Sequence, residues 1–145
     1  MRRGVALVEL VLVLVILGIV AGIVVPGSAA LTDRLAVEHQ AARLLAAYRS
    51  AWVAARMQQR LALLWISADT LAIRTVQSAG SPDTVLAWLA PGPSSAGVSL
   101  TSPARVSIFG PDGVAIGVSN ATHVLVKGGV TRKVVVSRLG RVRIQ

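Results

Sequence analysis

Chemically active side chains are sparse in this chain, and the exceptions lie near its two ends. Glu9 is the single charged residue in an apolar run over residues 5–25. A basic cluster without an acidic residue lies between positions 127 and 143, and its members are Lys127, Arg132, Lys133, Arg138, Arg141 and Arg143. A buried carboxylate needs a cationic partner, whereas clustered cations attract phosphates or carboxylates. These two features carry the chemistry that the sequence offers.

The remaining titratable residues form no recognisable catalytic or metal-binding pattern. His39 and His123 are isolated in the sequence, and we expect each to be solvated or packed. The acidic residues after the apolar run stand singly, whereas a calcium site needs several clustered oxygens. The chain has no cysteine, which excludes disulfides, thiolate metal sites and a cysteine nucleophile. We therefore predict neither an enzyme nor a bound cofactor or metal.

The composition is that of an apolar and basic protein. Hydrophobic residues make up 54% of the 145 residues and charged residues 14%, which excludes a disordered chain and is unusual for a soluble one. Fifteen Lys and Arg against six Asp and Glu give a net charge of +9. This balance favours anionic partners such as nucleic acid, lipid head groups or acidic protein surfaces.

The apolar run is long enough to cross a membrane as one helix. Residues 5–25 would span about 30 Å, the thickness of the hydrocarbon core. Arg2 and Arg3 precede the run, so the positive-inside rule places the N-terminus in the cytoplasm and everything after Leu31 outside. A cleaved signal peptide ending at residues 28–30, a twin-arginine signal and a plain anchor are alternatives. None of them explains Glu9, since a carboxylate at the centre of a membrane helix costs about 2.5–3.5 kcal/mol.

The N-terminal letters fit a known processing signal. "RRG" followed by "VALVELVLVLVILGIVAG" resembles the class III signal of type IV pilins and type II secretion pseudopilins. The resemblance implies that a prepilin peptidase cleaves after Gly4 and methylates Val5. It also places Glu9 at the position of the family's glutamate and Pro26 where a helix-loosening proline is common.

This resemblance provides Glu9 with a partner. Cleavage would leave a cationic amine at Val5, and Glu9 of a neighbouring subunit could pair with it, because two charges leave water at tolerable cost only as a pair. Glu9 would then recruit and register subunits in a filament. The implied partners are other pilins or pseudopilins, the prepilin peptidase, an inner-membrane assembly platform, and membrane lipid before assembly.

A long helix must position these groups. Pro26 and Gly27 should break or loosen it, and helical signals resume at Ser28 and continue to about Gln58 or Arg60. An apolar stripe at helical spacing predicts the face that packs on a domain; its members are Leu31, Leu35, Ala42, Leu45, Trp52 and Ala55.

Short apolar runs separated by turn residues follow Arg60 and predict strands. "LALLWIS" and "LAIRTV" form a hairpin, "TVLAWL" is a third strand, and "APGPSSAG" is a loop. "RVSIF" and "VAIGVS" flank a "GPDG" turn, "THVLVK" and "RKVVVS" flank "GGVT", and "GRVRIQ" follows. The spacing predicts two small antiparallel sheets.

The whole layout resembles the GspH/FimT family of minor pseudopilins and minor type IV pilins. The likeness lies in the N-terminal signal, in "FGPDG" followed by Gly117, and in "GRVR" at residues 140–143. It implies an α+β, type IV pilin-like fold, with a long N-terminal helix packed on a small β domain of two sheets. The expected parts are a leader at residues 1–4, a membrane and assembly helix at 5–27, its amphipathic continuation at 28–60, and a periplasmic β domain at 61–145.

Two functions remain open. "FGPDG" resembles the GspH side and implies a minor pseudopilin, in the H position, of a type II secretion system that drives protein export. "GRVR" matches the GRxR motif of FimT-type pilins and implies DNA binding during DNA uptake. Arg141 and Arg143 should point to one face of a strand, which suits phosphate oxygens, although the segment lacks aromatic residues that stack on bases. A solvated sheet face, or a surface that meets acidic neighbours, is the competing interpretation of the basic cluster.

Overall fold

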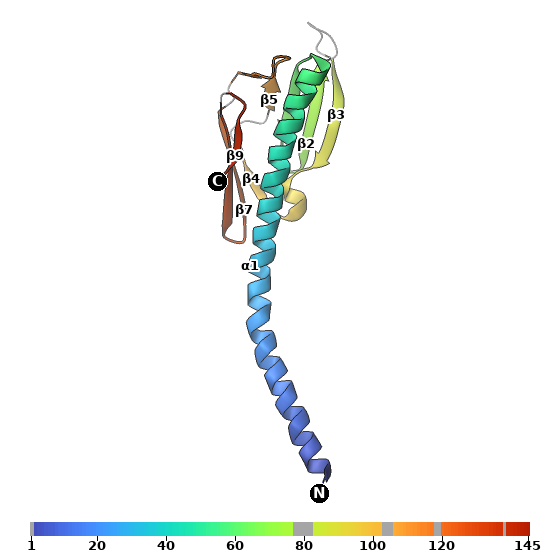
Figure 1. Cartoon of the computed structure of the whole chain (residues 1–145), viewed down its shortest axis with the longest axis vertical. Helices are drawn as coiled ribbons and strands as arrows, with labels where there is room; N and C mark the ends of the chain where they lie inside the picture. The colour runs from blue at the N-terminus through green and yellow to red at the C-terminus, as the bar shows by residue number, and fades with distance from the viewer. Residues whose placement is uncertain (1, 77–82, 103–105, 118–119, 138) are drawn as a thin grey trace. The chain divides into compact units, whose positions relative to one another are not determined.

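The structure is a computed structural model that describes residues 2–76, 83–102, 106–117, 120–137 and 139–145, with the side chains of residues 2–6 and 23–27 left out. It divides into two compact units, Met1–Asp33 and Arg34–Gln145. Helix α1 (Arg2–Gln58) begins in the first unit and ends in the second (Figure 1). The helix end predicted near Gln58 is confirmed.

The first unit is helical throughout its described residues. Helix α1 runs through Pro26 and Gly27 without interruption, so the predicted break is wrong, because a proline's fixed φ is compatible with a helix that gives up one hydrogen bond. The predicted loosening there stays a prediction, as do the roles of Gly4 and Val5, because these side chains lie outside the described residues. Among the described residues, no helical segment combines the length and the hydropathy that a membrane span requires.

The second half of α1 buries one face in the second unit. The fully buried residues of this face recur every three or four positions, and they are Val37, Ala41, Leu44, Ala47, Tyr48, Ala51 and Ala55. Of the predicted stripe, Ala55 is buried, but Leu35 and Trp52 are 57% and 39% exposed. The prediction chose the bulkier face, whereas the sheets pack against the alanine-rich face, where small side chains permit close approach.

One sheet contains five strands within the described residues. They are β1 (Ala62–Ile66), β2 (Thr70–Val76), β3 (Thr84–Pro91), β5 (Val106–Phe109) and β6 (Ala115–Ile116), in the order β3-β2-β1-β5-β6. The predicted first hairpin is confirmed, with Ala62 opposite Thr75 and Ile66 opposite Leu71. The strands predicted on either side of "GPDG" also pair, with Phe109 opposite Ala115.

The second sheet contains four strands within the described residues. They are β4 (Ser99–Thr101), β7 (Ala121–Lys127), β8 (Val130–Val136) and β9 (Val142–Ile144), in the order β4-β7-β8-β9. Gly128 and Gly129 join β7 to β8 with φ values of 53° and 81°, which is the backbone that tight hairpin turns require. The predicted loop before β4 contains a short 3-10 helix, η1 (Pro93–Ala96), and β4 itself was not predicted.

The core of the second unit joins α1 to both sheets, and Figure 1 shows β2 and β3 on one side of the helix and β7 and β9 on the other. A buried polar network lies within this core. The Tyr48 hydroxyl is 2.7 Å from Nε2 of His123 in β7 and 3.1 Å from Oγ of Ser107 in β5. Nδ1 of His123 is 2.8 Å from Oγ of Ser102. Burial lowers the pKa of His123 to about 4 and raises that of Tyr48 to about 12.

Candidate functional site

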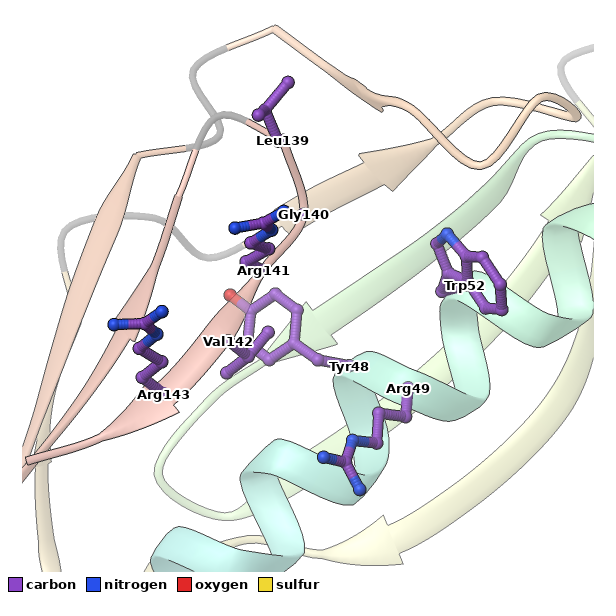
Figure 2. Close-up of a pocket in the computed structure, with 8 residues that line it drawn as sticks. All are labelled: Tyr48, Arg49, Trp52, Leu139, Gly140, Arg141, Val142 and Arg143. Atoms are coloured by element: carbon purple, nitrogen blue, oxygen red, sulfur yellow. The ribbon is translucent and has the colours of Figure 1, made fainter.

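A basic groove lies beside the C-terminal strand of the second unit. It encloses about 390 Å³, and its lining comes from α1 and from the segment that enters β9: Tyr48, Arg49, Trp52, Leu139, Gly140, Arg141, Val142 and Arg143 (Figure 2). Three of these side chains are guanidinium groups and none of the lining residues is acidic. We call this feature the basic groove.

A tight turn fixes the entry to β9. The amide of Gly140 donates to the Ser137 carbonyl at 2.9 Å, the amide of Ser137 donates to the Arg141 carbonyl at 2.8 Å, and the Arg141 amide donates to the Ser137 hydroxyl at 3.1 Å. Gly140 has a φ of 73°, a value at which residues with a Cβ are strained. The glycine of the "GRVR" motif is therefore a requirement of the turn that presents Arg141.

Arg141 and Arg143 flank one position of the strand and share one side of it. Val135 of β8 lies opposite Arg143, and Val136 lies opposite Val142. Figure 2 shows the two guanidinium groups extending in the same direction. Both arginines also line an adjoining hollow of about 400 Å³, together with Val135, Ser137, Leu139 and Gln145. This arrangement agrees with the predicted single face.

The other predicted basic residues do not join the basic groove. Lys127 donates from Nζ to the Ala96 carbonyl at 2.9 Å, at the far end of the β7–β8 hairpin. Arg132 donates from Nη2 to Oε1 of Glu38 at 3.0 Å. Lys133 lies on β8 with its backbone bonded to Gln145, and Arg138 is outside the described residues.

The ion pair of Arg132 involves a second arginine. Arg34 lies 3.2 Å from the same Glu38 oxygen. The hydrogen bonds from Arg34 and Arg132 hold the pKa of the Glu38 carboxyl below its usual value. Arg132 is thus engaged in holding β8 to α1, and its charge is partly balanced.

Helix α1 contributes Arg49 and Trp52, which the sequence did not reveal as members of a site. Trp52 was predicted to be packed, but its exposed fraction is 39%. The guanidinium carbon of Arg56 lies 5.0 Å from the centre of the Trp52 ring, which is cation–π geometry. The spacing Arg49-x-x-Trp52 places both residues on one face of the helix, and that is the signal that could have identified them.

The "GPDG" turn lies against the N–H edge of the Trp52 indole. The Gly110 amide donates to the Val114 carbonyl at 2.8 Å, and the Val114 amide donates to Oδ1 of Asp112 at 3.0 Å. Gly113 has a φ of 81°, and a Cβ there would lie 2.6 Å from Nε1 of Trp52. The motif is therefore a tight turn whose glycine leaves room for the indole.

The first unit presents the other candidate site. The Glu9 side chain is exposed, and the apolar residues around it are exposed as well, with Val8 at 66% and Leu10 at 61%. The intermolecular role of Glu9 stays a prediction.

Comparison with known proteins identifies the fold. No family model matches the chain, and no curated protein sequence matches it. Two solved structures do match, both of the type IV minor pilin FimU of Pseudomonas aeruginosa. In one crystal form FimU is 19% identical, with 79% of this chain and 92% of that chain covered at a TM-score of 0.64. In another it is 18% identical, with 74% and 91% covered at a TM-score of 0.60.

The fold is that of a type IV pilin. The long N-terminal helix and the two antiparallel sheets confirm the predicted α+β class. At this level of sequence identity the likeness concerns the arrangement of the chain.

Proposed function

We propose that the chain is a minor subunit of a type IV pilin-like filament and acts as a structural component without catalysing a reaction. The observation that carries this proposal is the pilin fold shared with FimU, on a chain whose apolar helical run holds a lone carboxylate, Glu9, among exposed apolar side chains. Before assembly, the chain spans the inner membrane once, with its N-terminus cytoplasmic and its β domain in the periplasm. A prepilin peptidase removes residues 1–4 and methylates Val5.

Assembly then depends on Glu9. Its carboxylate pairs with the amine at Val5 of a neighbouring subunit, since a charge held away from water is costly unless it is paired. The variant Glu9→Val should insert into the membrane as well as the natural chain but fail to enter filaments. Fractionation of sheared filaments from membranes measures this, with Leu10→Val as the matched control. Normal incorporation of Glu9→Val would contradict the assembly role.

The first placement within this class is the H position of a type II secretion pseudopilus. The tight "GPDG" turn against Trp52 supports it, since the sequence resembles the GspH side of the family at this motif. The β domain would then contact other minor subunits of a filament that an inner-membrane machine extends to export folded proteins. Deletion of the chain should stop the export of folded proteins without changing DNA uptake.

The second placement is a minor type IV pilin that binds DNA during uptake. The basic groove favours it, because Arg49, Arg141 and Arg143 are among its lining residues and none of these residues is acidic. Binding to duplex DNA should weaken with salt by a log–log slope of about 0.9 per phosphate contact. The double variant Arg141→Ala with Arg143→Ala should flatten that slope, whereas Arg74→Ala on the other sheet should leave it unchanged. No binding at low salt would remove this placement and leave the first.

A further inference from the structure

We propose that the outer edge of β3 binds an extended strand of another protein, and that this strand carries a carboxylate that pairs with Arg74. The site lies on the five-stranded sheet, whereas the basic groove lies beside β9 of the other sheet. The proposed binding goes beyond the assembly role of Glu9 and does not depend on it. The backbone of β3, its apolar side chains and the neighbouring cation each support it.

Strand β3 has an open backbone along one side. It pairs with β2, no described strand pairs with its other side, and Figure 1 shows it as the outermost strand on its side of α1. Such an edge offers a row of amides and carbonyls to another strand, and charges, prolines or bulges usually protect it. Strand β3 has a register shift opposite Ile73 and Arg74 and ends at Pro91, but it contains no charged residue. Its backbone therefore favours an extended polypeptide as the ligand.

The outer face of the sheet is apolar next to β3. Residues directly opposite each other in neighbouring strands point to the same face. Leu89 lies opposite Ala72, and Ala72 lies opposite Trp65, so the three form one row across the sheet. Together with Leu86 they line a hollow of about 490 Å³. Trp65, Leu86 and Leu89 are 47%, 48% and 59% exposed, and clustered exposed apolar side chains mark binding surfaces.

The inner face of β3 is also uncovered. Val85 lies opposite the buried Thr75, and Trp88 lies opposite the buried Ile73. Val85 and Trp88 nevertheless remain 48% and 38% exposed, so the core ends before it reaches β3. A strand added at this edge would cover apolar side chains on both faces of the sheet, whereas a helix or a lipid layer on the outer face would cover one of them. The exposure on both faces therefore favours a strand.

Arg74 determines the charge of the partner. It is exposed on β2 opposite Leu86 and is the only charged residue among the described residues that line the hollow. It forms no ion pair with any described residue. A residue of the added strand opposite Leu86 would lie two strand spacings from Arg74, or about 9.5 Å, a distance that the side chains of arginine and glutamate can bridge. Covering an unpaired guanidinium group is costly, so the partner should bring a carboxylate.

A second copy that pairs through its own β3 does not meet this requirement. The strand has no acidic residue, so the two copies would leave both Arg74 side chains without a carboxylate. The charge at the edge therefore favours a strand of different sequence.

The test measures the binding of two fluorescein-labelled nonapeptides to the full chain in detergent by fluorescence anisotropy. In both peptides threonine and valine alternate, and the central threonine is replaced by glutamate in one and by lysine in the other. The natural chain should bind the glutamate peptide at least about tenfold more tightly. Arg74→Glu should reverse this preference, which is a gain that an unfolded variant cannot show. Arg49→Glu, at an exposed position of α1, is the matched control with the same change in net charge and should keep the preference for glutamate.

A third peptide tests the backbone pairing. The glutamate peptide with every amide N-methylated lacks the donors that a strand needs, and it should not bind. Equal binding of the methylated peptide, or no binding of either nonapeptide to the natural chain, would overturn the addition of a strand. An unchanged preference in Arg74→Glu, or an equal loss of preference in Arg49→Glu, would overturn the role of Arg74.

Two further measurements distinguish the other occupants of the edge. A dimer in sedimentation equilibrium that Leu86→Asp dissociates would assign the edge to a second copy. Quenching of Trp65 and Trp88 by brominated lipid, in Trp52→Phe reconstituted into phosphatidylglycerol vesicles, would assign it to the membrane. Either result would overturn the choice of partner, and neither bears on the assembly role of Glu9.

Discussion

At the scale of single residues, Tyr48 of α1 and His123 of β7 link the helix to both sheets. Both are at most 1% exposed, and each ring contacts polar groups from another element. The Tyr48 ring also packs edge-on against Phe109, with ring centres 6.3 Å apart. The network thus satisfies buried polar atoms while fixing α1 against β5 and β7.

Removing the Tyr48 hydroxyl should destabilise the β domain. Tyr48→Phe leaves Nε2 of His123 and Oγ of Ser107 without the partner that they have now. An unsatisfied buried polar group costs about 1–3 kcal/mol, and the free energy of unfolding should fall by that amount. Urea denaturation of a fragment over residues 34–145 measures it. Unchanged stability would show that the network contributes nothing.

The buried histidine should make stability depend on pH. The pKa of His123 is lowered to about 4 from an ordinary value of 6.5, so the unfolded chain binds a proton between these values and the folded chain does not. The contribution of His123 to stability should therefore be constant above pH 6.5 and fall as the pH drops toward 4, by about 3 kcal/mol in total. Denaturation curves across this range measure the fall.

The matched control separates His123 from other titrating groups. Because Glu38 also has a lowered pKa, some stability is lost with acid in any variant. His123→Gln should remove most of the loss between pH 6.5 and 4, whereas His39→Gln, at an exposed position, should retain it. Equal acid sensitivity of the natural chain and His123→Gln would contradict this account.

At the scale of elements, the "GPDG" turn packs against Trp52 of α1, which lines the basic groove. Gly113→Ala would place a Cβ 2.6 Å from Nε1 of Trp52, at a φ of 81°. We expect a loss of about 1–2 kcal/mol in the free energy of unfolding and a shift in the emission of Trp52. Gly129→Ala, with the same φ but open space around it, is the control for strain alone. An unshifted Trp52 emission would show that the turn does not hold the indole.

The strands were predictable where strong turn signals separate short apolar runs. "GPDG" and the Gly128–Gly129 pair marked two of the hairpins that the structure confirms. Strand β4 was missed because its three residues, although they alternate between polar and apolar, are too few to distinguish a strand from a loop. The buried face of α1 was also missed, since alanine and leucine both count as apolar and the pattern alone does not say which face a sheet can approach.

Some of the residues that line the basic groove could be predicted from the sequence, and others could not. Arg141 and Arg143 are close in sequence and alternate on a strand, so their common face followed from local geometry. Arg49 and Trp52 lie far away in the sequence, and only the packing of α1 beside β9 brings them to the same hollow. Arg132 forms an ion pair with Glu38 of α1 instead of joining the basic groove. No local sequence pattern indicates this ion pair.

At the scale of the whole molecule, the two units have different surfaces and different proposed tasks. The described side chains of the first unit's apolar run are largely exposed, whereas the second unit has its own core of helix and sheet residues. We propose that the first unit serves assembly through Glu9 and the second presents the basic groove. The net charge of +9 would draw polyanions toward the second unit at low salt.

The central claim is that the chain is processed and assembled as a pilin-like subunit. Mass spectrometry of the native protein, taken from sheared filaments, tests it most directly. We predict a mature chain that begins with N-methylated Val5, so that its mass lacks residues 1–4 and carries one added methyl group. An intact N-terminus, with residues 1–4 still present in an assembled filament, would contradict the claim.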